Sequence, residues 1–173
     1  MPLLKKTELG HWEFSRSLDP DKHFGFVYCI TNEPEQRFYI GRKNFATGGK
    51  KTRKHPKTGK RIPNLAFGKD TKWRDYMGSS VDLGADIKRL GKDSFKFQIV
   101  DVYNTYGGLY YAEAYTQMCT ESMTKKLKEG RGLDCFRFYN RQVAPVRFRP
   151  QEEPTKKTRQ FIKKLEKDIL NGT

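Results

Sequence analysis

The chain has 173 residues, with 35 lysines and arginines against 20 aspartates and glutamates, and its formal net charge is +15 at neutral pH. Its hydrophobic fraction of 35% lies in short runs, which allows one domain with a modest core and excludes a membrane-spanning helix. No secretory signal is visible at the N-terminus, and the three scattered cysteines lack metal-site or disulfide spacing, so we expect a cytoplasmic protein with reduced thiols.

The first half of the chain predicts a β-hairpin. Residues 1–23 are treated as an N-terminal arm. Residues 24–30 are aromatic and β-branched and predict a strand, residues 31–35 have the composition of a turn, and residues 37–41 predict a second strand. Two strands joined by a short turn form an antiparallel hairpin.

A strongly basic insertion follows directly, from Arg42 to Lys69. It holds ten basic residues and no acidic one, and its glycines and prolines favour an extended loop over a packed element. Lysines and arginines that meet phosphates release condensed counterions, so we expect nucleic-acid contact, with a solvated loop or a targeting signal as alternatives. The residues expected to make this contact are Lys50, Lys51, Arg53, Lys54, Lys57, Lys60 and Arg61.

The rest of the chain predicts two helices and one more strand before a linker. Residues 71–77 are compatible with a short helix, and Ser79 or Ser80 caps a second one that ends at Gly91. Residues 95–100 alternate as a third strand. One long helix lies within residues 105–128, and residues 136–143 form a short aromatic segment.

Prolines mark a linker before a last, basic helix, which Thr155 caps. Its apolar residues Phe161, Leu165 and Ile169 share one face. The helix could contact DNA, bind a partner or dock on the core, and the apolar stripe favours docking with the basic face outward. The predicted fold is therefore a small α/β domain, with a three-stranded antiparallel sheet flanked by helices. It comprises an arm at 1–23, a domain at 24–145 that contains the insertion 42–69, and a linker with a basic C-terminal helix at 146–173.

The hairpin carries a resemblance to a known family. Val27-Tyr28 lies on its first strand and Tyr39-Ile40-Gly41 on its second. This pair resembles the two name motifs of the GIY-YIG nuclease superfamily, in particular its phage and homing-endonuclease members. Later segments are similar as well, and the resemblance spans about residues 25–143. Phe26 stands where the family's first motif opens with glycine, although Gly25 is adjacent.

The resemblance implies a set of site residues. Glu113, the only acidic residue between Asn104 and Thr120, corresponds to the glutamate that binds the metal, Mg²⁺ or also Mn²⁺. Tyr28 would be the general base, and Tyr39 would help to place the reacting groups. The family's arginine follows its second motif on a helix, which favours Arg74 and leaves Arg42 and Lys43 as rivals. Tyr76 would be an assisting aromatic residue, and Asn140 belongs to the late motif, which we expect to contact nucleic acid.

Function follows as an expectation from these residues. We expect a Mg²⁺-dependent DNA endonuclease that hydrolyses phosphodiester bonds, because such hydrolysis needs an activated water and charge stabilisation at phosphorus. The alternative is a basic nucleic-acid-binding protein, a phage or host-takeover factor, that keeps this fold without cleavage. DNA is the expected partner and a membrane is not. For a phage-encoded chain the compartment would be the host cytoplasm, and the sequence leaves open a monomer or a homodimer.

Overall fold

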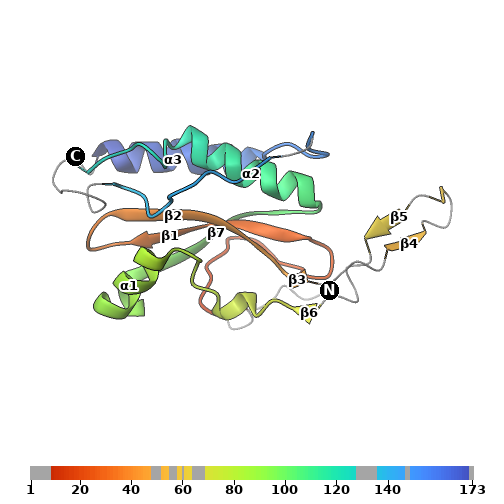
Figure 1. The fold of residues 1–173 in the computed structure, drawn as a ribbon, viewed down its shortest axis with the longest axis horizontal. Coiled ribbons are helices and arrows are strands. Elements are labelled where there is room, and N and C mark those ends of the chain that lie inside the picture. The colour runs from red at the N-terminus through yellow and green to blue at the C-terminus, as the bar shows by residue number, and fades with distance from the viewer. Residues whose placement is uncertain are drawn as a thin grey trace.

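The structure is a computed structural model, and it describes residues 9–47, 52–54, 58–59, 61–63, 69–127, 136–146 and 149–171. Its centre is an antiparallel sheet in the order β2-β1-β7, formed by β1 (Gly25–Asn32), β2 (Arg37–Asn44) and β7 (Phe95–Tyr103). Figure 1 shows α2 (Tyr106–Cys119) and α3 (Lys156–Asn171) over one face of this sheet and α1 (Val81–Leu90) on the other. The predicted hairpin, third strand and α/β fold class are confirmed.

The central strand β1 divides the core into two clusters. Because successive side chains on a strand point to opposite faces, Phe26, Tyr28 and Ile30 pack with the arm residue Trp12 on the α1 side. The intervening residues Val27 and Cys29 pack with side chains of α2 and α3 on the other side. The N-terminal arm therefore supplies part of the core, a role that its sequence did not indicate.

Both outer edges of the sheet are covered. Glu13 in the arm pairs with β7, where its N–H donates to the Phe97 carbonyl at 2.8 Å. At the other edge the N–H of Tyr139 donates to the carbonyl of Phe38 on β2 at 2.8 Å. Covered edges remove the unpaired backbone groups that would recruit other chains. The late segment is thereby fixed beside β2.

Helix α1 begins and ends where its sequence indicates, and α2 begins where expected but ends early. Ser80 caps α1, which ends at Gly91 in a positive-φ conformation, and Thr105 caps α2. The 105–128 segment leaves the helix after Cys119, since Glu121 has a φ of 52°. Residues 71–77 contain a 3-10 turn, η3 (Trp73–Asp75), instead of an α-helix, and another, η4 (Lys92–Ser94), precedes β7. No helix in the described part of the chain has the length and apolar character to cross a bilayer.

The basic insertion contains more paired structure than its composition predicts. Strand β2 continues to Asn44, so Arg42 and Lys43 lie on a strand and not in a loop. Beyond it, β3 (Ala46–Thr47) pairs with β6 (Lys69–Asp70). A second pair, formed by β4 (Thr52–Lys54) and β5 (Arg61–Pro63), projects past the main sheet (Figure 1). Backbone pairing satisfies donors and acceptors whatever the side-chain charge. Arg53, Lys54 and Arg61 lie on these strands, whereas Lys50, Lys51, Lys57 and Lys60 lie outside the described residues.

Candidate active site

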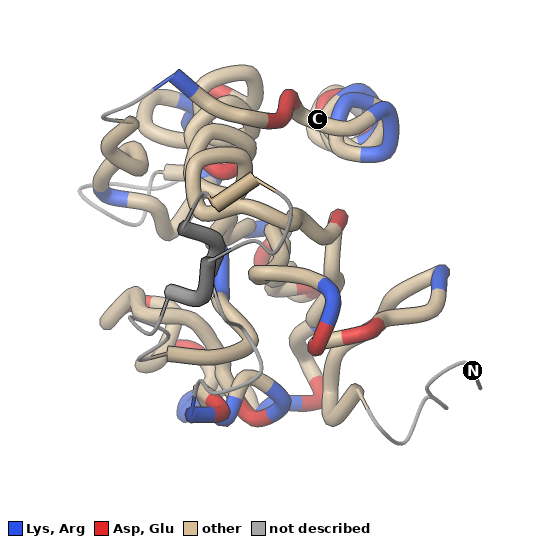
Figure 2. The backbone as a smooth tube through the Cα atoms, turned by 90° about the vertical axis from the view of Figure 1, so that its right-hand side faces the viewer, with Lys and Arg blue, Asp and Glu red and all other residues tan. Residues whose placement is uncertain are grey.

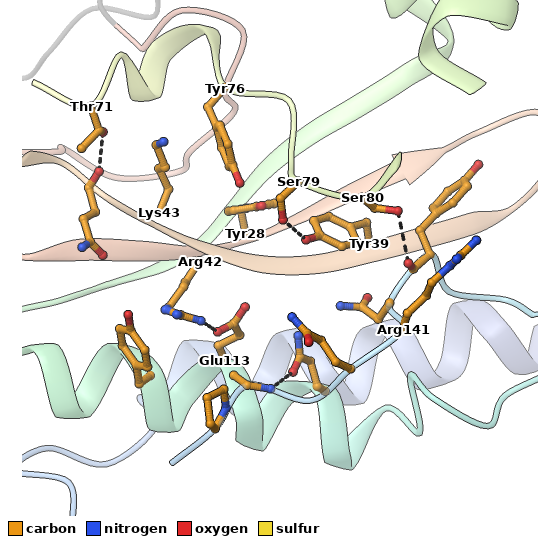
Figure 3. Close-up of a pocket in the computed structure, with 18 of the residues that line it drawn as sticks. Tyr28, Tyr39, Arg42, Lys43, Thr71, Tyr76, Ser79, Ser80, Glu113 and Arg141 are labelled. Carbon is orange, nitrogen blue, oxygen red and sulfur yellow. Dashed lines mark hydrogen bonds and ion pairs between the residues drawn. The ribbon is translucent and has the colours of Figure 1, made fainter. Parts of the chain in front are cut away.

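A cavity of about 520 Å³ lies between β2, α2 and the late segment (Figure 3). All predicted catalytic residues except Arg74 line it, together with residues that the sequence did not single out. The predicted ones at its wall are Tyr28, Tyr39, Arg42, Lys43, Tyr76, Glu113 and Asn140. Five separate segments, namely β1, β2, the 71–80 stretch, α2 and the late segment, thus bring these side chains to one place.

The alternation of β2 decides which side chains meet. Tyr39 and Lys43 point to the α1 side of the sheet, whereas Ile40 and Arg42 point toward α2. Gly41 lies opposite Tyr28 in the strand register. The cavity therefore wraps around the edge of β2 and receives groups from both faces.

Tyr28 is almost fully buried and its hydroxyl group lies over Gly41. Burial, followed by the charges of Tyr39 and Tyr76, raises the pKa of Tyr28 well above its ordinary value. Its ring centre lies 6.1 Å from that of Tyr39 and 6.0 Å from that of Tyr76. Burial also raises the pKa of Tyr39, whose hydroxyl hydrogen-bonds the Ser79 hydroxyl at 2.9 Å. Both phenols are therefore neutral at neutral pH.

Arg42 and Glu113 form a close ion pair across the cavity (Figure 3). The Glu113 side chain is 8% exposed, and burial raises its pKa even though Arg42 opposes the shift. The Arg42 guanidinium carbon also lies 3.4 Å from the centre of the Tyr110 ring. Burial lowers the pKa of Arg42, but the carboxylate of Glu113 and the phenol of Tyr110 outweigh it and raise the pKa. One guanidinium is thus held by a carboxylate and an aromatic face.

A second cation lies on the Tyr28 side of the cavity. The ammonium nitrogen of Lys43 is 3.8 Å from the centre of the Tyr76 ring. Partial burial lowers the pKa of Lys43, with Asp70 opposing the shift. The Tyr76 ring thus contacts Lys43 as well as Tyr28.

The comparison with protein families gives one match. The family model described as "Putative endonuclease segE, GIY-YIG domain" matches residues 11–143. The chain belongs to this GIY-YIG family. The match covers most of the chain and includes the arm from His11, so the resemblance predicted from the hairpin is confirmed and the domain is a nuclease domain. The comparisons with curated proteins and with solved structures found no match.

Arg74 is not among the residues that line the cavity, whereas its rivals Arg42 and Lys43 are. It follows β6 on η3, where a guanidinium nitrogen is 3.3 Å from an Asp70 carboxylate oxygen and the guanidinium lies over the Trp73 ring. Arg42 reaches Glu113 instead, because β2 extends past Gly41 and presents it toward α2. In this GIY-YIG chain the cation beside Glu113 is therefore Arg42, which lies on strand β2.

Asn140 holds the backbone of β2 through its side-chain amide, and its contact with nucleic acid stays a prediction. Its amide oxygen accepts from the Ile40 N–H at 2.9 Å and its amide nitrogen donates to the Ile40 carbonyl at 2.7 Å. Gln117 on α2 donates to the same carbonyl at 3.1 Å and accepts from the Ala144 N–H. Gln117 and Tyr110 lie at +4 and −3 from Glu113, so the helical period could have placed both beside it.

The donor set of the cavity fits a hard divalent cation. Glu113 is the only carboxylate among the residues that line it, and the described residues contain no cluster of three or more histidines, cysteines, aspartates or glutamates. Mg²⁺ keeps most of its waters and takes one or two protein carboxylates plus phosphate oxygens. A single glutamate beside an open cavity is compatible with that preference.

Proposed function

We propose that this protein is a DNA endonuclease that hydrolyses phosphodiester bonds with one divalent cation, Mg²⁺ or Mn²⁺. The observation that carries the proposal is the meeting of Tyr28, Arg42 and Glu113, from β1, β2 and α2, at one cavity in a chain of the GIY-YIG family. These three supply a proton acceptor, a cation and an oxygen ligand.

Tyr28 is proposed as the general base. Its raised pKa keeps it protonated, so the phenol must lose its proton before it can take one from water. Positive charge from Arg42 and Lys43 favours that loss. Solvent takes the phenol proton. The water oxygen then attacks phosphorus, its proton passes to the Tyr28 oxygen, the bond from phosphorus to the leaving oxygen breaks, and the leaving oxygen takes a proton from solvent.

The other cavity residues position and stabilise. Arg42 would leave Glu113 and contact the scissile phosphate, where its planar guanidinium stabilises developing charge. Tyr39, anchored by Ser79, and Tyr76, beside Lys43, would orient the phenol of Tyr28. Glu113 would hold the divalent cation, which when bound supplies charge stabilisation at the phosphate oxygens.

The basic insertion is proposed as a phosphate clamp beside this centre. Ten of its residues are basic and none is acidic, and it continues directly from β2, which carries Arg42 and Lys43. Its charge thus begins at the cavity wall. Neutralising Lys50, Lys51, Arg53 and Lys54 should weaken binding to every sequence and lower the slope of log affinity against log salt by about 3 to 4. An unchanged salt slope would show that the insertion does not contact DNA phosphates.

The alternative is a protein that binds nucleic acid on this fold without cutting it. The observation that favours it is the Arg42–Glu113 pair, since a carboxylate held by a guanidinium is a poor ligand for a cation. Incubation of supercoiled plasmid with Mg²⁺ or Mn²⁺ separates the two. We expect nicked or linear product from the wild type.

Matched variants then identify the centre. Glu113→Gln and Tyr28→Phe should lose cleavage by at least about a thousandfold and retain DNA binding, as for groups needed only in the reaction. Glu121→Gln, on an exposed glutamate, and Tyr115→Phe, on the other side of α2, serve as controls and should cleave normally. If the wild type binds DNA but leaves the plasmid intact with either Mg²⁺ or Mn²⁺, the non-catalytic alternative holds.

A further inference from the structure

Helix α3 lies beyond the segment matched by the family and is fixed on the core. Leu165 and Ile169 are buried in the cluster that contains Leu109 of α2. At its start, the hydroxyls of Thr158 and Tyr103 hydrogen-bond at 2.7 Å, and Thr155 accepts from the Thr158 N–H. The apolar face thus sets the rotation of the helix, as the docking prediction required, and determines which residues face outward.

We name as the lysine face five residues on the outward side of α3: Lys156, Lys157, Lys163, Lys164 and Lys167. Figure 2 shows basic residues along the backbone of this helix. At 3.6 residues per turn these five residues and Gln160 fall within an arc of about 120°, with Glu166 and Asp168 on its two borders. In the described part of the chain Arg159 pairs with Glu153, but no carboxylate lies within ion-pair distance of these lysines.

Within the protein this arrangement of charge is unfavourable. Lys156 and Lys157 occupy the first turn of the helix, which contains no acidic residue and where the helix dipole disfavours cations. Lys163 and Lys167 are four residues apart and repel one another, and Glu166 and Asp168, at i+3 from Lys163 and i+4 from Lys164, compensate only part of this charge. A rigid surface with such unbalanced positive charge is stabilised most by binding an anion whose charges are regularly spaced.

The lysine face also lies at a distance from the catalytic cavity. The cavity is at the β2 edge of the sheet, whereas α3 packs against β7 at the opposite edge and against α2. Lys157 and Lys164 line a separate groove between α3, β7 and the N-terminal arm, with Phe14 and Phe161 in its wall. Phosphates on this face would belong to a different stretch of nucleic acid from the one in the cavity.

We propose that the lysine face is a second DNA-binding surface, which contacts the phosphate backbone of duplex outside the segment held at the cavity. The choice of DNA as the polyanion rests on the proposed function. From Lys156 to Lys167 the face is about 16 Å long, a length over which duplex DNA carries about ten phosphates. Such a surface carries no base readout and adds affinity that depends on DNA length and on salt.

The test compares binding of the full chain to duplexes of about 10 and about 40 base pairs, by fluorescence anisotropy in EDTA over a salt series. The variant is Lys163→Gln with Lys167→Gln, which keeps good helix formers in place. Its control is Lys88→Gln with Lys92→Gln, two exposed lysines on the α1 side of the sheet. Thermal unfolding shows whether each variant keeps the fold.

The lysine-face variant should bind the long duplex roughly ten- to thirtyfold more weakly near physiological salt, with the salt slope reduced by about 2. Its affinity for the short duplex, and all binding by the control, should stay within about twofold of wild type. Unchanged affinity and slope on long DNA would overturn the inference, and so would equal losses on both lengths. If the wild type binds through this face but cuts no DNA, the proposed function fails and this inference stands.

Discussion

The hydroxyl of Tyr28 occupies the space above Gly41 where any other residue would place its β-carbon. A β-carbon built on Gly41 would lie 2.6 Å from Cζ of Tyr28, and the hydroxyl oxygen is nearer still. The two residues face one another in the strand register, and Tyr28 is too deeply buried to move aside freely. The glycine of the second motif therefore makes room for the phenol of the first.

Replacing Gly41 by alanine should displace the Tyr28 hydroxyl. We expect a loss of about 1–3 kcal/mol in the free energy of unfolding, as for other overpacked cores. Cleavage should fall by about a hundredfold, since misplacement of a catalytic group by about 1 Å has an effect of that order. Urea unfolding and plasmid nicking measure the two quantities.

Gly84→Ala on α1 is the control, because nothing lies within 4 Å of the new β-carbon. It should leave cleavage unchanged. Tyr28→Phe with Gly41→Ala should recover part of the lost stability by removing the closest atom. If Gly41→Ala costs as much stability in the Tyr28→Phe protein as in the wild type, the alanine does not act by displacing the Tyr28 hydroxyl.

Arg42 should compete with a divalent cation for Glu113. The guanidinium contacts the carboxylate that the cation would need, so Arg42→Ala should raise Mg²⁺ or Mn²⁺ affinity by roughly tenfold while it lowers cleavage. Calorimetric titration with Mn²⁺ gives the affinity, and plasmid nicking gives the activity. Glu113→Gln should abolish the binding. Weaker metal binding by Arg42→Ala would mean that Arg42 supports the site instead of competing for it.

Local sequence patterns, together with the family resemblance, placed much of this centre. The aromatic and β-branched composition of residues 24–30, with a turn and a second strand at 37–41, implied a hairpin that brings Tyr28 near Tyr39, and the family resemblance singled out Glu113, the one carboxylate on its helix. These are local patterns, in which the geometry of one strand or helix decides where a side chain points. The structure brings all three to one cavity.

Contacts between distant segments were not predictable in the same way. The choice between Arg42 and Arg74 depended on where β2 ends, and a basic run gives no signal for that. Asn140 lies 100 residues from Ile40, so only the folded chain reveals that its amide is already bonded. Side-chain identity suggests a role, but the available partners decide it.

Tyr110 should position Arg42 through its ring. The guanidinium lies over the ring at 3.4 Å, and Tyr106 stacks on Tyr110 with ring centres 3.9 Å apart. Tyr110→Ala should lower cleavage by about tenfold, the equivalent of a cation–π contact of 1–2 kcal/mol, whereas Tyr110→Phe should stay within about threefold of wild type. Tyr111→Ala, outside the residues that line the cavity, is the control. Equal losses for Phe and Ala would assign the effect to the hydroxyl.

Asn140 should matter for stability and not for DNA affinity. Asn140→Ala removes two hydrogen bonds to the Ile40 backbone, and we expect a loss of about 2–3 kcal/mol in the free energy of unfolding. The salt slope of DNA binding should be unchanged. Gln142→Ala, at an exposed neighbour, should change stability by less than about 0.5 kcal/mol. A reduced salt slope for Asn140→Ala, with stability unchanged, would indicate that Asn140 contacts nucleic acid directly.

His11 should make the fold sensitive to mild acid. Burial, reinforced by the charge of Lys92, lowers the pKa of His11 from 6.5 to about 4, and a ring nitrogen lies 3.1 Å from the Tyr76 carbonyl oxygen. Between these two pKa values the unfolded chain holds the extra proton, so the free energy of unfolding falls as pH drops from about 6.5 to about 4. Because the ring is only half-buried, we expect the loss to be about 1–2 kcal/mol.

The variant His11→Phe isolates this effect, since phenylalanine can pack against Trp12 and Phe97 as the imidazole does but cannot take up a proton. Urea unfolding of both proteins across the acidic range measures the difference, which cancels the carboxylates that titrate in both. Wild type should lose stability relative to the variant as the pH falls, and the difference should be constant above pH 7. A pH-independent difference throughout would show that His11 keeps its ordinary pKa. The packing of the arm against the Tyr76 segment would then exert no influence on the titration of His11.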